Sequence, residues 1–299
     1  LSGRPTSDVV FTITSSDTGE ATVTSSLTFT NANWNTAQTV TVTGVDDNLI
    51  DGSVNSTLTV AVVDAASDDN FDAVANQTVT ATTTDNDVAG FTIAQTGGST
   101  SVAETGTTDT FTVVLNAQPA SNVVISISSS DSGEATVSGS LTFTAANWNT
   151  PQTVTITGVD DVTVDGAQAS TVTVSIIDAI SDNDFDGVAD QTVSVSTADN
   201  DTAGFTVTES GGSTSVDESG TTDTFTVVLD AQPTSNVVLT VTSSDTGEAT
   251  VNSPLTFTAA NWDTPQTVTV TGVNDASVDD GNQTSTVTIS DNDGSSNDS

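Results

Sequence analysis

The stretch SDTGEATV at residues 16–23 returns as SDSGEATV at residues 130–137 and as SDTGEATV at residues 244–251. One motif therefore occurs three times at a constant spacing of 114 residues, and Trp34, Trp148 and Trp262 keep the same spacing. Self-similarity at a fixed period is the sequence signature of a repeat protein. The chain of 299 residues is thus predicted to be a tandem array.

The segments between these landmarks are short runs with apolar residues at every second position, such as FTVVL at 111–115, TVTIT at 153–157 and TVTVS at 171–175. Thr and Val dominate the runs, and β-branched residues at period two are typical of half-buried strands. Gly, Asn, Asp, Ser and Pro fill the gaps, as they do in turns. With about seven strands per repeat, we predict an all-β fold of tandem immunoglobulin-like β-sandwich domains in a linear array.

The repeat register divides the chain into a first unit at residues 1–87, a middle unit at 88–201, a last unit at 202–293 and a polar tail at 294–299. Residues 4–10 align with 118–124, so the first unit is predicted to be a partial sandwich without its first two strands. Two explanations stay open: the chain is a window on a longer array, or a neighbouring molecule donates the missing strands. The middle unit is complete, and the last unit is shortened by a hairpin.

The charge of the chain excludes several classes of function. Forty acidic residues stand against one base, Arg4, and the formal net charge is −39. Nucleic acids and anionic membrane surfaces are bound through Lys and Arg, so neither is expected as a partner. His, Cys and Lys supply most activated groups in enzymes and are absent, so catalysis is not expected. No apolar run approaches the ~20 residues that span a bilayer, and we expect no direct membrane insertion.

The alternating direction of successive strands predicts where the acidic residues gather. In the middle unit, the segments around Glu104, Asp131, Asp160 and Asp199 all fall at one pole, beside the linker into the next unit. Carboxylates so close together raise one another's pKa unless a cation neutralises them. Oxygen ligands without imidazole or thiolate favour Ca²⁺ over zinc or copper. The sequence therefore predicts calcium at this acidic pole.

The opposite pole of the middle unit carries a weaker calcium signal. Asp182, Asp184 and Asp186 form a D-x-D-x-D-G run, which is the first half of an EF-type loop. Val193 stands at the twelfth position, where such a loop has a carboxylate. Calcium binding and a plain solvated loop stay open here. In a stacked array this loop would face the acidic pole of the preceding unit, with Asp85 and Asp87 in the linker between them.

The middle unit resembles the Calx-beta domain, found in sodium/calcium exchangers and in tandem arrays of bacterial surface proteins. The resemblance rests on GFT at 90–92, SVAE at 101–104 and the closing DND at 199–201, and it covers essentially the whole chain. The linker DNDVAGF at 85–91 is also similar to the calcium-binding linker of cadherins. The resemblance implies a sandwich that binds calcium at its distal loops. The implied ligands are Glu104, Asp131, Asp160, Asp161, Asp199 and Asp201 in the middle unit, Asp17, Asp46, Asp47, Asp85 and Asp87 in the first, and Glu218, Asp245, Asp275, Asp291 and Asp293 in the last.

The three copies depart from one another at some of these positions. Asn274 replaces the acid found at Asp46 and Asp160, and the first unit has no counterpart of Glu104, so calcium occupancy is expected to differ between units. The acids at 17, 131 and 245 are equally well explained as turn residues in contact with water. For the Trp residues, a structural role at the sandwich edge is favoured over sugar stacking.

Two functions are consistent with these observations. The first is a calcium-rigidified segment of an extracellular fibre, adhesin stalk or biofilm-matrix filament, with calcium ions and neighbouring copies of the same chain as partners. The second is an adhesion module that binds a carbohydrate or protein ligand. The near-uniformity of the copies favours the first function, since a ligand site predicts one repeat that diverges at a surface patch.

Overall fold

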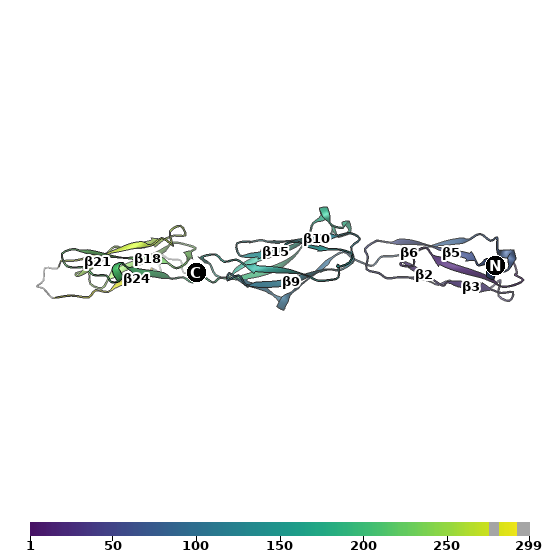
Figure 1. Cartoon of the computed structure of the whole chain (residues 1–299), viewed down its shortest axis with the longest axis horizontal. Helices are drawn as coiled ribbons and strands as arrows, with labels where there is room; N and C mark the ends of the chain where they lie inside the picture. The colour runs from purple at the N-terminus through teal and green to yellow at the C-terminus, as the bar shows by residue number, and fades with distance from the viewer. Residues whose placement is uncertain (275–280, 292–299) are drawn as a thin grey trace.

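The computed structural model describes residues 1–274 and 281–291. Within these residues the chain is all-β, and its strands form successive antiparallel sandwiches along the long axis of the molecule (Figure 1). The predicted fold class is confirmed. The predicted tail at 294–299, Asp275 and Asp293 lie outside the described residues. The unit boundaries stay predictions, and the names first, middle and last unit are kept for the three repeats.

The middle unit has two sheets that face each other across its core. The first sheet has the strand order β12 (Leu141–Phe143), β10 (Val123–Ser129), β15 (Gln168–Ile176), β16 (Gln191–Ala198) and β8 (Thr100–Ala103). The second has the order β11 (Ala135–Val137), β13 (Gln152–Gly158), β9 (Thr108–Leu115) and β7 (Phe91–Gln95). All neighbouring strands are antiparallel except β8 and β16, which run parallel.

The alternation read from the sequence explains the core of the middle unit. Val154 and Ile156 of β13 are fully buried, while Thr153 of the same strand is exposed. Phe111 and Phe143 come from the two opposite sheets and are fully buried in the same cluster. Burial of one such side chain stabilises the fold by about 1.5–3 kcal/mol. Trp148 packs against this cluster, and Trp262 packs against the equivalent cluster of the last unit.

The chain changes sheet near the start of the middle unit. After β7, the 3-10 turn η3 (Thr96–Gly98) carries it into β8, which belongs to the other sheet. β8 passes very close to the end of β13. A Cβ atom added to Gly158 would lie only 2.1 Å from the carbonyl oxygen of Ala103. A side chain at residue 158 would push β8 away, together with the residue that follows it, Glu104.

The last unit repeats this arrangement in part. One sheet has the order β17 (Phe205–Glu209), β18 (Thr222–Leu229), β23 (Gln266–Gly272) and β21 (Ala249–Val251), and the other has β22 (Leu255–Phe257), β20 (Val237–Ser243) and β24 (Val287–Asp291). Leu239 pairs with Asp291 in the way that Ile125 pairs with Ile176, so β24 takes the place of β15. β24 is therefore the edge strand of its sheet among the described residues.

The first unit has one four-stranded sheet and one short ladder. The sheet has the order β3 (Ser26–Phe29), β1 (Val9–Ser15), β5 (Val54–Val62) and β6 (Gln77–Thr83), and the ladder joins β2 (Ala21–Val23) to β4 (Val42–Gly44). Val42 is 44% exposed, whereas the corresponding Ile156 of the middle unit is fully buried beneath β9 and β7. The first described strand of the first unit, β1, therefore corresponds to β10 of the middle unit.

The helical content is limited to 3-10 turns. Besides η3 these are η1 (Asp64–Ala66), η2 (Asp69–Phe71), η4 (Asp178–Ile180), η5 (Asn183–Phe185) and η6 (Ser210–Gly212). In the described part of the chain, none of the helical segments has the length and apolar character needed to cross a membrane.

Candidate metal centre

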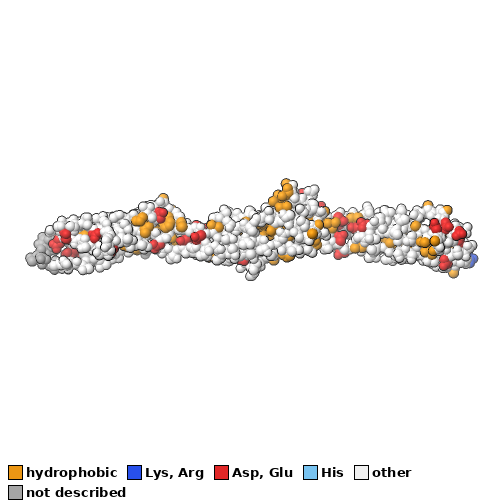
Figure 2. Space-filling model, in the orientation of Figure 1, with side chains coloured by type: hydrophobic (Ala, Val, Ile, Leu, Met, Phe, Trp, Pro, Cys, Tyr) orange, Lys and Arg blue, Asp and Glu red, His pale blue; other side chains and the backbone are white. Residues whose placement is uncertain are grey.

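The carboxylates are unevenly distributed over the molecule. On the face seen in Figure 2, they gather near the ends of the units, while other side chains cover most of the length between them. The single base, Arg4, lies near the N-terminus, where its guanidinium donates to the side chain of Asn31. The acidic groups at the junction of the middle and last units therefore have no basic side chain to neutralise them.

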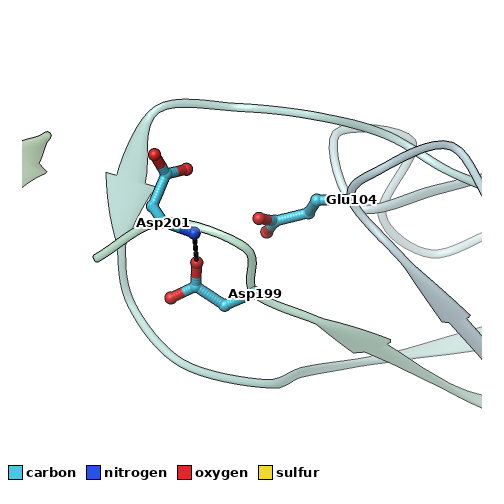
Figure 3. Close-up of side chains that lie close together, drawn as sticks. All are labelled: Glu104, Asp199 and Asp201. Carbon is cyan, nitrogen blue, oxygen red and sulfur yellow. Dashed lines mark hydrogen bonds between the residues drawn. The ribbon is translucent and has the colours of Figure 1, made fainter.

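Five acidic side chains meet at the acidic pole of the middle unit, called the middle pole below. Glu104 follows β8, Glu134 precedes β11, Asp161 follows β13, and Asp199 and Asp201 follow β16. They form two triads, Glu104–Asp199–Asp201 and Glu104–Glu134–Asp161, and within each triad the ligand oxygens lie within 4.8 Å of one another. Glu104 belongs to both, and Figure 3 shows its carboxylate directed toward the loop that carries Asp199 and Asp201.

Several oxygens at the middle pole are buried without a partner. Glu104 is only 1% exposed and Glu134 only 8%. Oε1 of Glu104, Oε2 of Glu134, Oδ1 of Asp165 and Oδ2 of Asp201 are all buried and accept no hydrogen bond. A buried polar atom without a partner costs about 1–3 kcal/mol, and more when it is charged. A bound cation would give all four of these oxygens a partner.

The remaining oxygens of these side chains are held by donors. Oε2 of Glu104 accepts from the backbone N–H of Asn200 at 3.0 Å, and Nδ2 of Asn200 donates to Oδ1 of Asp160 at 2.7 Å. Oδ2 of Asp199 accepts from the N–H groups of Asp165 and Gly166 at 3.1 and 2.8 Å, and its Oδ1 accepts from Asp201 at 2.6 Å. These hydrogen bonds fix the orientation of the carboxylates without a bound ion.

The electrostatic environment disfavours the charged form of the buried acids. Burial raises the pKa of Glu104, and the neighbouring charges of Asp199 and Asp161 raise it further. Burial and the charges of Asp165 and Asp161 likewise raise the pKa of Glu134. Asp199 differs: burial acts to raise its pKa, but the three backbone donors outweigh that effect and lower it. The pole therefore combines a firmly ionised acid with acids that ionise at a cost.

The donor set fits calcium. Ca²⁺ takes six to eight oxygen ligands, several of them carboxylates, in flexible geometry. The middle pole offers five carboxylates in the two triads and no nitrogen or sulfur ligand from His or Cys, because the chain has neither residue. Of the ligands expected in this unit, the structure brings together Glu104, Asp161, Asp199 and Asp201, and it joins Asp160 to them through Asn200.

Two residues of the middle pole are absent from the ligands implied by the resemblance. Glu134 completes the second triad, and Asp165 contributes a buried oxygen without a partner. The signal for Glu134 was present in the repeat motif, which keeps Glu20, Glu134 and Glu248 just before an inward-facing Ala. In all three units, the backbone carbonyl of this Glu accepts a hydrogen bond from the N–H of the residue that follows β4, β13 or β23. These donors are Val45, Val159 and Val273.

Asp131 lies outside both triads. Its Oδ1 accepts from the backbone N–H of Gly133 at 2.9 Å, and the carboxylate is exposed. Asp17 and Asp245 make the same bond to Gly19 and Gly247. This geometry is an Asx turn, in which the side chain closes a local loop. Between the two explanations left open by the sequence, the contacts favour the turn.

The acidic pole of the first unit, called the first pole below, has the same frame but no buried acid. Oδ2 of Asp85 accepts from Asp51 and Gly52 at 3.2 and 2.9 Å, and its Oδ1 accepts from Asp87 at 2.7 Å. Glu20, Asp47, Asp51, Asp85 and Asp87 line a cavity of about 20 Å³. Asp46 and Asp47 are exposed. Burial, then the charges of Asp85, Asp46, Asp47 and Asp51, raise the pKa of Asp87.

The expected ligands of the last unit do not come together in the described residues. Glu218 is exposed and lines a wide cavity of about 1150 Å³ together with Asp217 and Glu248. Asp291 ends β24 opposite Leu239, at the pole away from Glu248. Asp291 matches Asp199 in sequence, but the last unit has one strand fewer, so strand alternation predicts that Asp291 emerges at the opposite pole unless the chain crosses over. The antiparallel pairing of β24 with β20 agrees with this prediction.

The acids of the opposite pole hold the chain together by hydrogen bonds. Asp182 is 6% exposed, and its carboxylate accepts from the backbone N–H groups of Ser121 at 2.6 Å and Asp184 at 3.2 Å. Asp68 of the first unit has the same role, with Thr6, Ser7 and Asn70 as donors, and these bonds hold its pKa well below the usual range. Asp184 and Asp186 belong to neither triad.

Comparison with known proteins gives fold likenesses only. No protein-family model matches the chain, and no curated protein matches it. Similar solved structures include domains 4 and 5 of the S-layer protein SbsC (17% identity, TM-score 0.30, 63% of this chain and 70% of that chain covered). A longer segment of that protein, domains 4–9, is 17% identical with a TM-score of 0.32 and covers 93% of this chain and 38% of that chain.

A third similar structure is calcium binding domain CBD12 of CALX1.1, at 14% identity and a TM-score of 0.28, with 61% of this chain and 76% of that chain covered. At TM-scores this low, the likenesses carry no argument for the function of this chain. The functional proposal therefore rests on the geometry of the middle pole.

Proposed function

We propose that this chain is a calcium-binding structural segment of an extracellular fibre, adhesin stalk or biofilm-matrix filament. In this proposal, Ca²⁺ at the acidic poles stiffens the array, and other copies of the chain are its partners in the fibre. The observation that carries the proposal is Glu104, which is 1% exposed, has an oxygen without a partner and belongs to two carboxylate triads.

The net charge of −39 supports the same conclusion. Self-repulsion of this size opposes a compact state, and bound cations relieve it. Calcium binding would therefore contribute directly to folding stability. At a calcium concentration of about 100 times the Kd, a single site stabilises the folded state by about 2.7 kcal/mol.

The proposed ligands are Glu104, Glu134, Asp161, Asp199 and Asp201 in the middle unit, with Asp160 and Asp165 beside them. Glu104 would bridge the two triads, and Asn200 would hold Glu104 and Asp160 in place. In the first unit, Glu20, Asp47, Asp51, Asp85 and Asp87 offer a more open site. The bound ion would neutralise acids that otherwise ionise at a cost.

The test is calorimetric titration of the chain with calcium, together with thermal melts and small-angle X-ray scattering in calcium and in excess EGTA. We expect binding, a higher melting temperature and a change from a flexible, expanded particle to a straight rod. Identical melting and scattering in the two buffers would show that calcium neither stabilises nor straightens the chain. The ligand-binding adhesion module would then be the better proposal.

A further inference from the structure

Consecutive units touch through short parallel pairings that we call the clasps. At the first junction, Leu49 forms a parallel bridge with Gln118. At the second, β14 (Thr163–Val164) pairs in parallel with β19 (Gln232–Pro233). The two clasps use equivalent bonds, because the N–H of Gln118 donates to Asn48 at 2.6 Å and that of Gln232 donates to Val162 at 2.6 Å.

Side-chain contacts support the backbone pairing of each clasp. Nε2 of Gln118 donates to the carbonyl of Ala145 at 3.1 Å, and Nε2 of Gln232 donates to that of Ala259 at 2.7 Å. Each Gln is thus anchored within its own unit. Oγ1 of Thr163 donates to Oε1 of Gln232 at 3.3 Å across the second junction. At the first junction, Ile50 packs against the core of the middle unit.

Each clasp begins two residues after an acid of the preceding pole. Oδ1 of Asp161 accepts from the N–H of Thr163 at 2.6 Å, and Oδ1 of Asp47 accepts from the N–H of Leu49 at 2.8 Å. Asp161 also belongs to the triad with Glu104 and Glu134. One carboxylate therefore closes the turn of the clasp and takes part in the candidate metal site.

No residue of the following unit belongs to either triad among the described residues. The hydrogen bonds between units in the described residues are those of the clasps. A cation at the middle pole must then act on the last unit indirectly. Without a cation, the charges of Glu104 and Glu134 repel Asp161 and weaken the turn that it closes.

We propose that Asp161 is a positioning residue that couples calcium occupancy of the middle pole to the orientation of the last unit through the clasp. Asp47 closes the corresponding turn at Leu49, beside the more open site proposed for the first unit. This inference rests on the proposed function. A cation at the triad fixes the carboxylate of Asp161, the carboxylate fixes the turn at Thr163, and the turn presents Val162 to Gln232.

The experiment separates the clasp from the ligands. Thr163→Pro removes the N–H that Asp161 accepts and leaves every acidic side chain in place. Leu49→Pro is the matched change at the first junction. The chain has no Cys, so spin labels are attached at Ser128→Cys and Thr242→Cys for the second junction and at Thr14→Cys and Ser128→Cys for the first; all three positions are exposed. Distance distributions are measured by pulsed EPR with calcium and with EGTA, and calcium binding by calorimetry.

In the parent protein, we expect calcium to narrow both distance distributions. Thr163→Pro should still bind calcium but keep a broad 128–242 distribution, while the 14–128 distribution narrows as in the parent. Leu49→Pro should show the reverse pattern. Thr163→Val, which loses only the bond to Gln232, should broaden the second junction in part, and it covers the case in which the Pro variant does not fold.

The outcomes distinguish the two proposals. If the parent binds no calcium, the proposed function is wrong. If the parent binds calcium, and both Thr163 variants narrow at the second junction as the parent does, calcium binding stands and the coupling through the clasp is overturned.

Discussion

The first and middle poles share one frame and differ in one strand. In both, an Asp after the final strand, Asp85 or Asp199, accepts backbone hydrogen bonds from the preceding hairpin and from the second Asp of the DND motif. Only the middle unit has β8, which delivers Glu104 into the centre of this frame. The described strands of the first unit include no equivalent of β8.

This difference separates what a local turn provides from what the complete sandwich provides. The DND turn orients one carboxylate in each unit by short-range hydrogen bonds. A buried acid with an unpartnered oxygen requires a strand from the opposite edge of the sandwich to cross the pole. Calcium affinity is therefore expected to be higher at the middle pole than at the first pole.

The largest expected effect comes from Glu104→Gln. This change removes the carboxylate common to both triads, and calcium affinity at the middle pole should fall by about 100-fold, because Ca²⁺ affinity depends strongly on the number of charged ligands. In EGTA the same variant should melt at a higher temperature than the parent, since it no longer buries an unpaired charge. Calorimetry and thermal melts check the two effects.

Asp131→Asn is the matched control for this change. It removes an acid from the same end of the unit, but Asn still closes the turn at Gly133. Affinity and melting temperature should both stay close to those of the parent. If Glu104→Gln and Asp131→Asn weaken calcium binding equally, the affinity comes from general charge, and the middle pole is not a specific site.

An intermediate effect is expected from Gly158→Ala, with Gly44→Ala as its counterpart in the first unit. A Cβ at residue 158 would lie 2.1 Å from the carbonyl oxygen of Ala103, whereas at residue 44 the nearest atom is Cγ2 of Thr83 at 3.7 Å. Overpacking of this kind costs about 1–3 kcal/mol. The middle unit should be destabilised by that amount, and the first unit should be almost unchanged.

Each unit has one Trp, so unfolding of a single unit can be followed by fluorescence after the other two are replaced by Phe. Gly158→Ala should also weaken calcium binding, because it displaces β8 and Glu104. Equal stability losses from the two Gly variants would show that β8 does not approach β13 closely.

The smallest effect is a pH dependence in the calcium-free protein. The folded-state pKa values of Glu104 and Glu134 lie above the ordinary 4.5, so the folded state binds protons more tightly than the unfolded state does. The stability of the middle unit should rise as pH falls from neutral through the raised pKa values, and this gain should be complete near pH 4.5. Below the ordinary 3.8 of Asp199, whose pKa is lowered, stability should fall again.

Chemical denaturation in EGTA at a series of pH values, followed at Trp148, measures this dependence. The first unit, followed at Trp34, should respond less, because Glu20 and Asp87 are less buried than Glu104. Glu104→Gln should flatten the curve of the middle unit. A parent whose middle unit loses stability steadily on acidification from neutral pH would contradict the assignment of buried, unpaired carboxylates.

The sequence predicted the fold class and the pole at which the acids gather, because both follow from short-range patterns. Alternation of Val and Ile with Thr determines which face of β13 is buried, and the strict sequence of strands places Glu104, Asp161 and Asp199 at one end. The repeat also showed that the first unit has no counterpart of Glu104.

Other features depend on contacts that a linear pattern does not contain. Asp131 and Glu134 are three residues apart at the same pole, yet only Glu134 points into the site, because Asp131 is used to close its own turn. Asp182 matches a calcium loop in spacing, but backbone donors of Ser121 and Asp184 already occupy its oxygens. Asp291 is different, because counting the strands of the shortened unit already predicts that it emerges at the opposite pole unless the chain crosses over.

The parallel pairing of β8 with β16 has a mechanical consequence. β8 follows β7 and η3 near the start of the middle unit, and β16 is its last strand. A pull on the two ends of the unit that reaches β8 and β16 therefore drags these strands past each other in opposite directions. The pairs from Thr100–Val195 to Ala103–Ala198 are then loaded in shear, and their hydrogen bonds must break together rather than one after another. Glu104 and Asp199 immediately follow the two strands. An ion held between them would cross-link the two strands at the end where the pull on β16 enters the sheet.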